Sequence, residues 1–141
     1  MFEVVMVGAD DSVTAKRAVE VATDIAAMYG ATLHIVTAFE KGERKGDVGS
    51  EFTHVHSEDD GLALLQTLSF IAKKQNIEPG LHSVRGDAAD ALLAKAKELN
   101  ADLIVVGNRG MRGLRRVLGS VPNSVSHNAH CSVLVVDTID G

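Results

Sequence analysis

The 141-residue sequence contains one cysteine, two prolines and no tryptophan, and only 4% of its residues are aromatic. A single cysteine excludes an internal disulfide, which is usual for a protein of the reducing cytoplasm. We therefore expect a cytoplasmic location, with Cys131 as a small buried hydrophobe rather than a reactive thiol. The sequence lacks an apolar run near the ~20 residues that a membrane-spanning helix needs. It also lacks a basic leader ahead of its first strand-like run, so we expect neither a membrane anchor nor a secretion signal.

Positive charge is also scarce, because 14 Lys and Arg face 19 Asp and Glu and leave a net charge of −5. This balance argues against broad binding to nucleic acids or anionic membranes. A composition of 45% hydrophobic and 23% charged residues is typical of a globular protein, and the length suits one domain. We expect a single domain over residues 1–141.

Residues 40–60 contain little that a core could bury, and we interpret them as a long exposed loop. His54 and His56 lie here beside the acidic run 58–60, so metal binding is conceivable. The absence of regular ligand spacing and of cysteine partners favours a solvated polar loop instead.

Strand-like and helix-like patterns alternate along the rest of the chain. The apolar runs are continuous rather than alternating, as in parallel strands covered on both faces. Asp11 or Ser12 is expected to cap the first helix, with Met28 and Tyr29 on its apolar stripe and Gly30 at its end. Asp87 and Ser120 are expected to cap two later helices, and Pro122 is tolerated in a first turn. Strands are expected over 2–7, 31–39, 81–85, 102–106 and 132–136, and helices over 12–29, from 62 to about 76, over 87–99 and over 120–128.

This alternation predicts an α/β fold, a doubly wound five-stranded parallel sheet with helices on both faces. With the strand order 3-2-1-4-5, a ligand crevice lies between the carboxyl ends of the first and fourth strands. The turn 8–12 and the glycine-rich stretch 107–120 meet there. Asp10 could accept a hydrogen bond from an amino group such as that of adenine. The alternative is that Asp10 only complements a helix dipole.

The glycine-rich stretch 107–120 follows an apolar strand and leads into a helix-like segment. Glycines allow a phosphate to approach the backbone, and a helix N-terminus favours negative charge. Four arginines lie within eight positions of this stretch, at 109, 112, 115 and 116. We therefore predict phosphate binding, with a surface loop of solvated arginines as the alternative.

These residues resemble the universal stress protein family, specifically its nucleotide-binding branch. The branch motif is glycine, two residues, glycine, nine residues, then Gly-Ser or Gly-Thr. Gly107, Gly110 and the pair Gly119-Ser120 match it, although eight residues rather than nine separate Gly110 from Gly119. Gly113 could absorb the missing residue. The opening run 7–12 and the closing runs 119–125 and 131–136 are also similar to the family, so the resemblance covers nearly the whole chain outside 40–60.

The resemblance implies an adenine-nucleotide α-hydrolase-like fold and a bound adenine nucleotide: ATP, alone or with Mg²⁺, with AMP and cyclic AMP as alternatives. It also implies a homodimer formed through the last strand, 133–136, whose edge position favours pairing. Arg109 and Arg112 are added from charge alone. The nucleotide-binding residues that we expect are Gly8, Ala9, Asp10, Ala38, Val106, Gly107, Arg109, Gly110, Arg112, Gly119, Ser120, Val121 and Pro122.

Catalysis is not expected to be the main activity. The stretch 107–120 contains neither the lysine of a P-loop nor an acidic residue. His127 and His130 could face the phosphates, but ordinary histidines at a helix end are the simpler interpretation. Three functions stay open: an ATP-binding stress-response regulator, a slow ATPase, and a dimeric interaction protein with an empty site.

Overall fold

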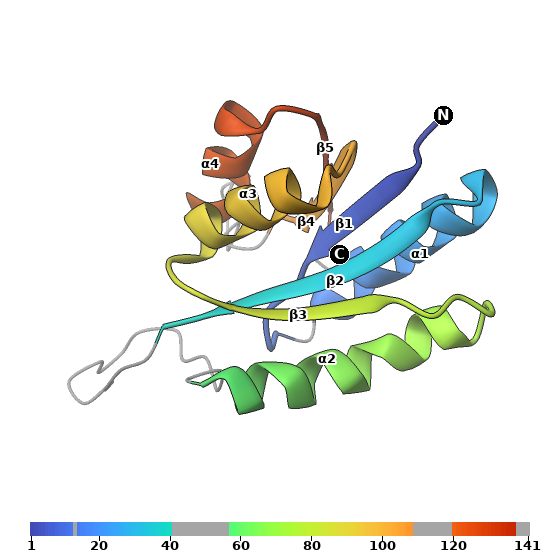
Figure 1. The fold of residues 1–141 in the computed structure, drawn as a ribbon, viewed down its shortest axis with the longest axis horizontal. Coiled ribbons are helices and arrows are strands. Elements are labelled where there is room, and N and C mark those ends of the chain that lie inside the picture. Colours follow the sequence, from blue (N-terminus) through green and yellow to red (C-terminus); the bar gives the residue numbers. More distant parts are fainter. Residues whose placement is uncertain (13, 41–56, 109–119, 138–141) are drawn as a thin grey trace.

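The computed structural model describes residues 1–12, 14–40, 57–108 and 120–137. Its five parallel strands form one sheet with the order β3-β2-β1-β4-β5, which confirms the predicted topology (Figure 1). Most of the expected loop 40–60 lies outside the described residues. The strands are β1 (Val4–Gly8), β2 (Thr32–Phe39), β3 (Gly80–Arg85), β4 (Leu103–Gly107) and β5 (Ser132–Val136), and the described helices are α1 (Ala15–Tyr29), α2 (Glu58–Lys73), α3 (Ala88–Leu99) and α4 (Ser120–Asn128).

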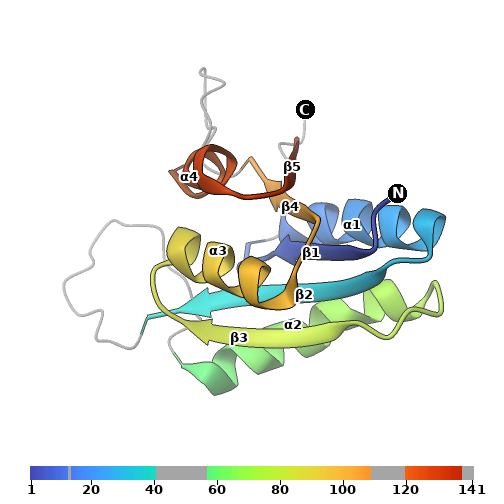
Figure 2. The same cartoon turned by 45° about the horizontal axis from the view of Figure 1, so that its top comes forward.

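Helices cover both faces of the sheet, and Figure 2 shows α2 and α3 on opposite sides of β2 and β3. Side chains of β1 alternate between the two layers. Val5 and Val7 pack with α1 and α2 residues in one core cluster, whereas Met6 packs with α3 and α4 residues in the other. All three are fully buried. The sheet is therefore enclosed between two apolar layers, as continuous apolar strands require.

Helix α1 ends at Gly30 in the left-handed region (φ 67°), as predicted, but it begins later than expected. Its N-cap is Thr14, which makes no side-chain capping bond. The N-cap is therefore neither Asp11 nor Ser12, the two residues that were predicted, and the Ser12 hydroxyl donates to Asp10 instead. The buried face also differs, because Met28 is 73% exposed and Tyr29 is largely exposed. Small residues of the helix, such as Ala22 and Ala26, face the sheet and allow close packing.

Helix α2 begins at Glu58, four residues before the expected start, and this corrects the assignment of 58–60 to a loop. The Ser57 hydroxyl accepts from the Asp60 amide at 3.1 Å and caps the helix. Acidic side chains at 58–60 are favourable there because a helix N-terminus carries partial positive charge. Polarity alone therefore suggested a loop where the sequence carries a helix start.

The remaining helices and strands lie close to the positions that the sequence predicts. Asp87 caps α3 by accepting from the Asp90 amide at 3.2 Å, as predicted. Cys131 is half-buried rather than fully enclosed. Burial, and then the negative charge of Asp102, raise the pKa of its thiol, which agrees with an unreactive cysteine. None of the helices within the described ranges is long and apolar enough to cross a membrane.

Candidate functional site

A cavity of about 210 Å³ opens at the carboxyl ends of β1 and β4. Chain connections diverge here, since β1 leads to β2 on one side and pairs with β4 on the other. Such a switch point is the usual ligand position in open α/β sheets. The cavity is lined by Gly8, Ala9, Asp10, Ser12, Thr14, Ala15, Ala18, Thr37, Ala38, Ala88, Leu92, Val106, Gly107, Ser120, Val121 and Pro122.

The end of β1 forms the centre of the cavity wall. A Cβ on Gly8 would lie 2.7 Å from Cδ1 of Leu92, so the absence of a side chain lets α3 pack closely at this point. The next amide, that of Ala9, donates to the carbonyl of Val36 at 2.9 Å and continues the pairing with β2. The loop after β1 therefore leaves the sheet from a fixed backbone position.

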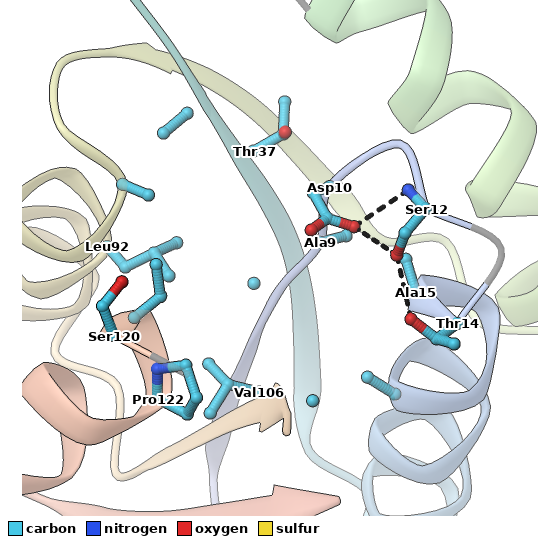
Figure 3. A pocket seen from close by; sticks show the side chains of 16 residues that line it. Ala9, Asp10, Ser12, Thr14, Ala15, Thr37, Leu92, Val106, Ser120 and Pro122 are labelled. Carbon is cyan, nitrogen blue, oxygen red and sulfur yellow. Dashed lines mark hydrogen bonds between the residues drawn. The ribbon is translucent and has the colours of Figure 1, made fainter. Parts of the chain in front are cut away.

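Asp10 is oriented by its own loop (Figure 3). Its Oδ1 accepts from the Ser12 amide at 2.9 Å and from the Ser12 hydroxyl at 2.6 Å. The Ser12 hydroxyl also lies 2.9 Å from the Thr14 hydroxyl. A carboxylate that bonds the backbone two residues ahead forms an Asx-turn, which fixes the side chain at the cavity mouth.

The opposite wall comes from β4 and the start of α4. Val106 and Gly107 end the strand, and Ser120 begins the nine-residue helix whose first turn lines the cavity. Amide groups of a first helical turn have no partner within the helix and favour negative charge. This wall combines a glycine strand end with a helix N-terminus, the arrangement that commonly binds phosphate.

The buried Asn108 secures the exit of the chain from β4. Its amide donates to the carbonyl of Val136 at 3.0 Å, and its side-chain Nδ2 donates to Oδ1 of Asp137 at 3.2 Å. These bonds extend the pairing of β4 with β5 beyond the strand end. The position from which the glycine-rich stretch departs is therefore rigid.

Comparison with known proteins shows the family of the chain. The model of the universal stress protein family matches residues 1–137. The chain belongs to the universal stress protein family. Universal stress protein Rv1636 of Mycobacterium tuberculosis is 34% identical over 97% of both chains, and Slr1101 of Synechocystis is 42% identical over 59% of this chain and 78% of its own. A universal stress protein solved in complex with cAMP is 35% identical, covers 98% of this chain and 99% of its own, and has a TM-score of 0.78.

Nine residues that the sequence analysis selected line the cavity of this universal stress protein together. They come from β1 and its loop, the end of β2, the end of β4 and the first turn of α4. The other four, Arg109, Gly110, Arg112 and Gly119, lie outside the described residues. The nine are Gly8, Ala9, Asp10, Ala38, Val106, Gly107, Ser120, Val121 and Pro122.

Sequence reasoning did not select seven further lining residues. Ser12 and Thr14 lie close to Asp10 in the sequence, and this closeness could have identified them as cavity residues. Thr37 is a polar residue within a buried strand, which was a second signal. Helix α3 contributes Ala88 and Leu92 to the cavity, but its sequence matches no motif, so nothing in the sequence identified these two as cavity residues. The seven are Ser12, Thr14, Ala15, Ala18, Thr37, Ala88 and Leu92.

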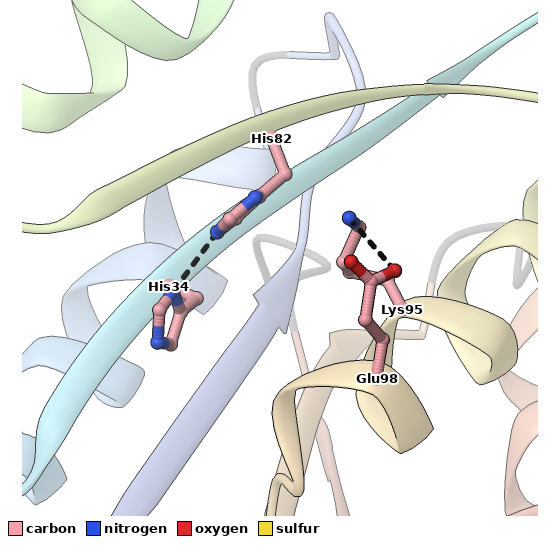
Figure 4. Close-up of polar contacts among 4 residues, drawn as sticks. All are labelled: His34, His82, Lys95 and Glu98. Carbon is pink, nitrogen blue, oxygen red and sulfur yellow. Dashed lines mark hydrogen bonds and ion pairs between the residues drawn. The ribbon is translucent and has the colours of Figure 1, made fainter.

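A second polar cluster lies at the β3 edge of the sheet, away from the cavity (Figure 4). Nδ1 of His34 on β2 lies 2.9 Å from Nε2 of His82 on β3. Lys95 and Glu98 of α3 form an ion pair of 3.1 Å beside them. Burial, followed by the positive charge of Lys95, lowers the pKa of His34. Burial first, and then the charges of His34 and Lys95, lower the pKa of His82.

His54 and His56, the candidate metal ligands of the sequence, lie outside the described residues. Within the described ranges, no three His, Cys, Asp or Glu side chains form a group that could hold a metal ion. His127 of α4 is exposed, and its Nδ1 lies 3.3 Å from the carbonyl oxygen of Asn123. It therefore has the local contact expected of an ordinary helix-end histidine.

Proposed function

We propose that this universal stress protein binds an adenine nucleotide in the cavity between β1 and β4. The observation that carries the proposal is the convergence of two unlike walls on that cavity. One wall presents the oriented carboxylate of Asp10, and the other presents Gly107 and the first turn of α4. A carboxylate suits the amino group of a base, whereas a helix N-terminus suits phosphate.

ATP is the ligand that we propose first. The sequence 107–120 resembles the nucleotide-binding motif of the family, with eight residues rather than nine between Gly110 and Gly119, and its four arginines suit a triphosphate. In this proposal Gly107, Gly110 and Gly119 let the phosphates approach the backbone, and Arg109 and Arg112 neutralise their charge. Mg²⁺ would accompany the triphosphate. Three or four hydrogen bonds to charged groups, each worth about 1.5–3 kcal/mol, give a range that includes the roughly 8 kcal/mol of micromolar binding.

Cyclic AMP is the second candidate, because the relative solved in complex with cAMP is similar to this chain over nearly its whole length. Both ligands share adenine and ribose and differ in the number of phosphates. A regulatory module is the role that we propose, because the stretch 107–120 has neither a P-loop lysine nor an acidic residue. A homodimer through β5 completes the proposal, since β5 is an edge strand of the sheet.

The decisive experiment is to denature the purified protein and identify the nucleotide that it releases. Titrations of nucleotide-free protein with adenosine, AMP, cyclic AMP, ADP and ATP then rank the ligands. Gly119→Val should abolish binding of every phosphorylated compound while lowering stability by only about 1–2 kcal/mol. Arg112→Ala should weaken binding in proportion to phosphate number.

The alternatives give different results in the same assays. A slow ATPase would convert ATP to ADP in a turnover measurement, and the loss of that turnover in Gly119→Val would locate it at this site. An interaction protein with an empty site would release no nucleotide and bind none of the five compounds. That last result would refute the proposed function.

A further inference from the structure

Two hydroxyl side chains lie next to each other under the first turn of α2. Thr37 of β2 and Ser83 of β3 are partners in the strand register, so their side chains emerge on the same face. Gly61 of α2 covers both. A Cβ on Gly61 would collide with the Ser83 hydroxyl and would lie 3.0 Å from Cγ2 of Thr37. The methyl branch of Thr37 therefore faces α2.

Neither hydroxyl has a hydrogen-bond partner within the described part of the chain. The Oγ of Ser83 is fully enclosed. The Thr37 side chain is only 1% exposed, but it lines the cavity beside Ala9, Asp10 and Ala38 (Figure 3). A fully enclosed hydroxyl without a partner, such as that of Ser83, costs stability. The Thr37 hydroxyl instead belongs to a residue that lines the cavity, where a bound molecule can reach it.

The other polar side chains that line the cavity have different tasks. Asp10 only accepts hydrogen bonds when ionised, and its loop partners Ser12 and Thr14 are bonded to each other. Ser120 lies at the phosphate-binding wall, at the start of α4. On the described wall around Ala38, Thr37 is therefore the side chain that can donate a hydrogen bond to a ligand.

We propose that the Thr37 hydroxyl binds the ligand directly, by donating a hydrogen bond to a ring nitrogen of the base. The inference rests on the proposed function, because it places a nitrogen heterocycle at this end of the cavity. Adenine carries both an amino donor and ring-nitrogen acceptors. Asp10 and Thr37 recognise these two features separately, one as acceptor and one as donor. Binding also gives the Thr37 hydroxyl a hydrogen-bond partner, which the described residues do not supply.

The test is Thr37→Val, which removes the hydroxyl and keeps the shape of the side chain. We expect its affinity for both adenosine and ATP to fall by about 3- to 10-fold, the usual effect of one lost hydrogen bond. Its midpoint of thermal unfolding without ligand should stay close to that of the parent, because the removed hydroxyl makes no hydrogen bond within the described part of the chain. Thr37→Ser keeps the hydroxyl and should retain affinity.

Ser83→Ala is the matched control, because it removes the neighbouring unpartnered hydroxyl, which does not line the cavity. It should raise the unfolding midpoint and leave the affinity for adenosine unchanged. Equal affinities of the parent and Thr37→Val for adenosine would overturn the inference, and Thr37→Ala takes its place if the valine variant does not fold. If the parent itself binds neither adenosine nor any adenine nucleotide, the proposed function fails. If the parent binds and the valine variant binds equally well, only the role of Thr37 fails.

Discussion

The carboxylate of Asp102 binds the backbone amide of Glu3, with a distance of 2.9 Å from Oδ2 to the amide nitrogen. Its Oδ1 accepts from the Val4 amide at 3.0 Å. The residue before β4 thus bonds to the start of β1, almost one hundred positions earlier in the chain. Burial raises the pKa of the Asp102 carboxyl, but the hydrogen bonds from Glu3 and Val4 and the positive N-terminus outweigh burial and lower it.

Asp102→Ala should lower the free energy of unfolding at neutral pH by about 1–3 kcal/mol, because two backbone amides lose a charged acceptor. Urea unfolding measures this loss. Glu20→Gln on the exposed side of α1 is the control and should change stability by less than about 0.5 kcal/mol. A lowered pKa in the folded protein means that the stabilisation is complete above the ordinary value of 3.8 and is lost as the pH falls through the folded value. An Asp102 variant with unchanged urea and acid unfolding would contradict this role.

The His34–His82 pair predicts a second pH dependence, in a higher range. The pKa of both imidazoles is lowered from 6.5, so the unfolded chain takes up protons there before the folded protein does. Stability should therefore fall as the pH drops below about 6.5. Lys95 opposes protonation of both histidines, whereas Glu98 favours protonation of His82.

The double variant His34→Gln/His82→Gln should flatten this part of the stability curve. Urea unfolding at several pH values between 7 and 5 provides the measurement. His127→Gln, at an exposed position on α4, should leave the slope as in the parent. A double variant with the parent's slope would show that other groups cause the dependence.

Asp10 should select the base. Asp10→Ala is expected to cost about 1–3 kcal/mol of binding free energy for ATP and less for GTP or ITP, whose bases carry an oxygen in place of the amino group. Calorimetric titration of the three nucleotides gives the comparison. Ser12→Ala is the control for the loop, because it removes the 2.6 Å bond to Asp10 and keeps the carboxylate. Equal losses for ATP and ITP would mean that Asp10 does not contact the amino group.

The homodimer is best tested at Leu134. This side chain is 36% exposed on the edge strand β5, whereas Val133 and Val135 pack against the core cluster with Met6. Leu134→Lys should shift the protein toward monomer in analytical ultracentrifugation, because an edge lysine disfavours strand pairing. Leu62→Lys on α2, also 36% exposed in the parent, should not. A parent protein that sediments as a monomer at high micromolar concentration would exclude the dimer.

The sequence was most informative where a pattern had one structural meaning. Continuous apolar runs such as 103–106 predicted parallel strands, and Gly30 and Asp87 marked helix ends correctly. Patterns that fit two different structures led to wrong predictions. The acidic run 58–60 suits both a solvated loop and a first helical turn. Only the packing of α2 on β3 shows that the run forms a helical turn. Met28 fits an apolar stripe by spacing, but the sheet approaches the face of α1 that carries small residues.

The residues of the candidate site also differ in how far the sequence could predict them. Local motifs could select Asp10, Gly107 and Ser120, because Asp10 follows a strand, Gly107 ends one and Ser120 follows the glycine-rich stretch. Leu92 and Ala88 reach the cavity through the packing of α3, which no local pattern records. Thr37 was detectable only as a polar residue in an apolar strand, and its place at the cavity depends on the register between β1 and β2, which pairs Gly8 with Val36.

The central position of β1 has a consequence for synthesis of the chain. One neighbour of β1 is β2, the next strand in the sequence, whereas the other neighbour, β4, is synthesised much later, since Val5 pairs with Leu103. Long-range pairing of this kind slows folding because a long segment must close before the contact forms. The segments that form one wall of the cavity are therefore synthesised early, and those that form the other wall are synthesised late. Nucleotide capture would then report that the newly made chain has finished folding.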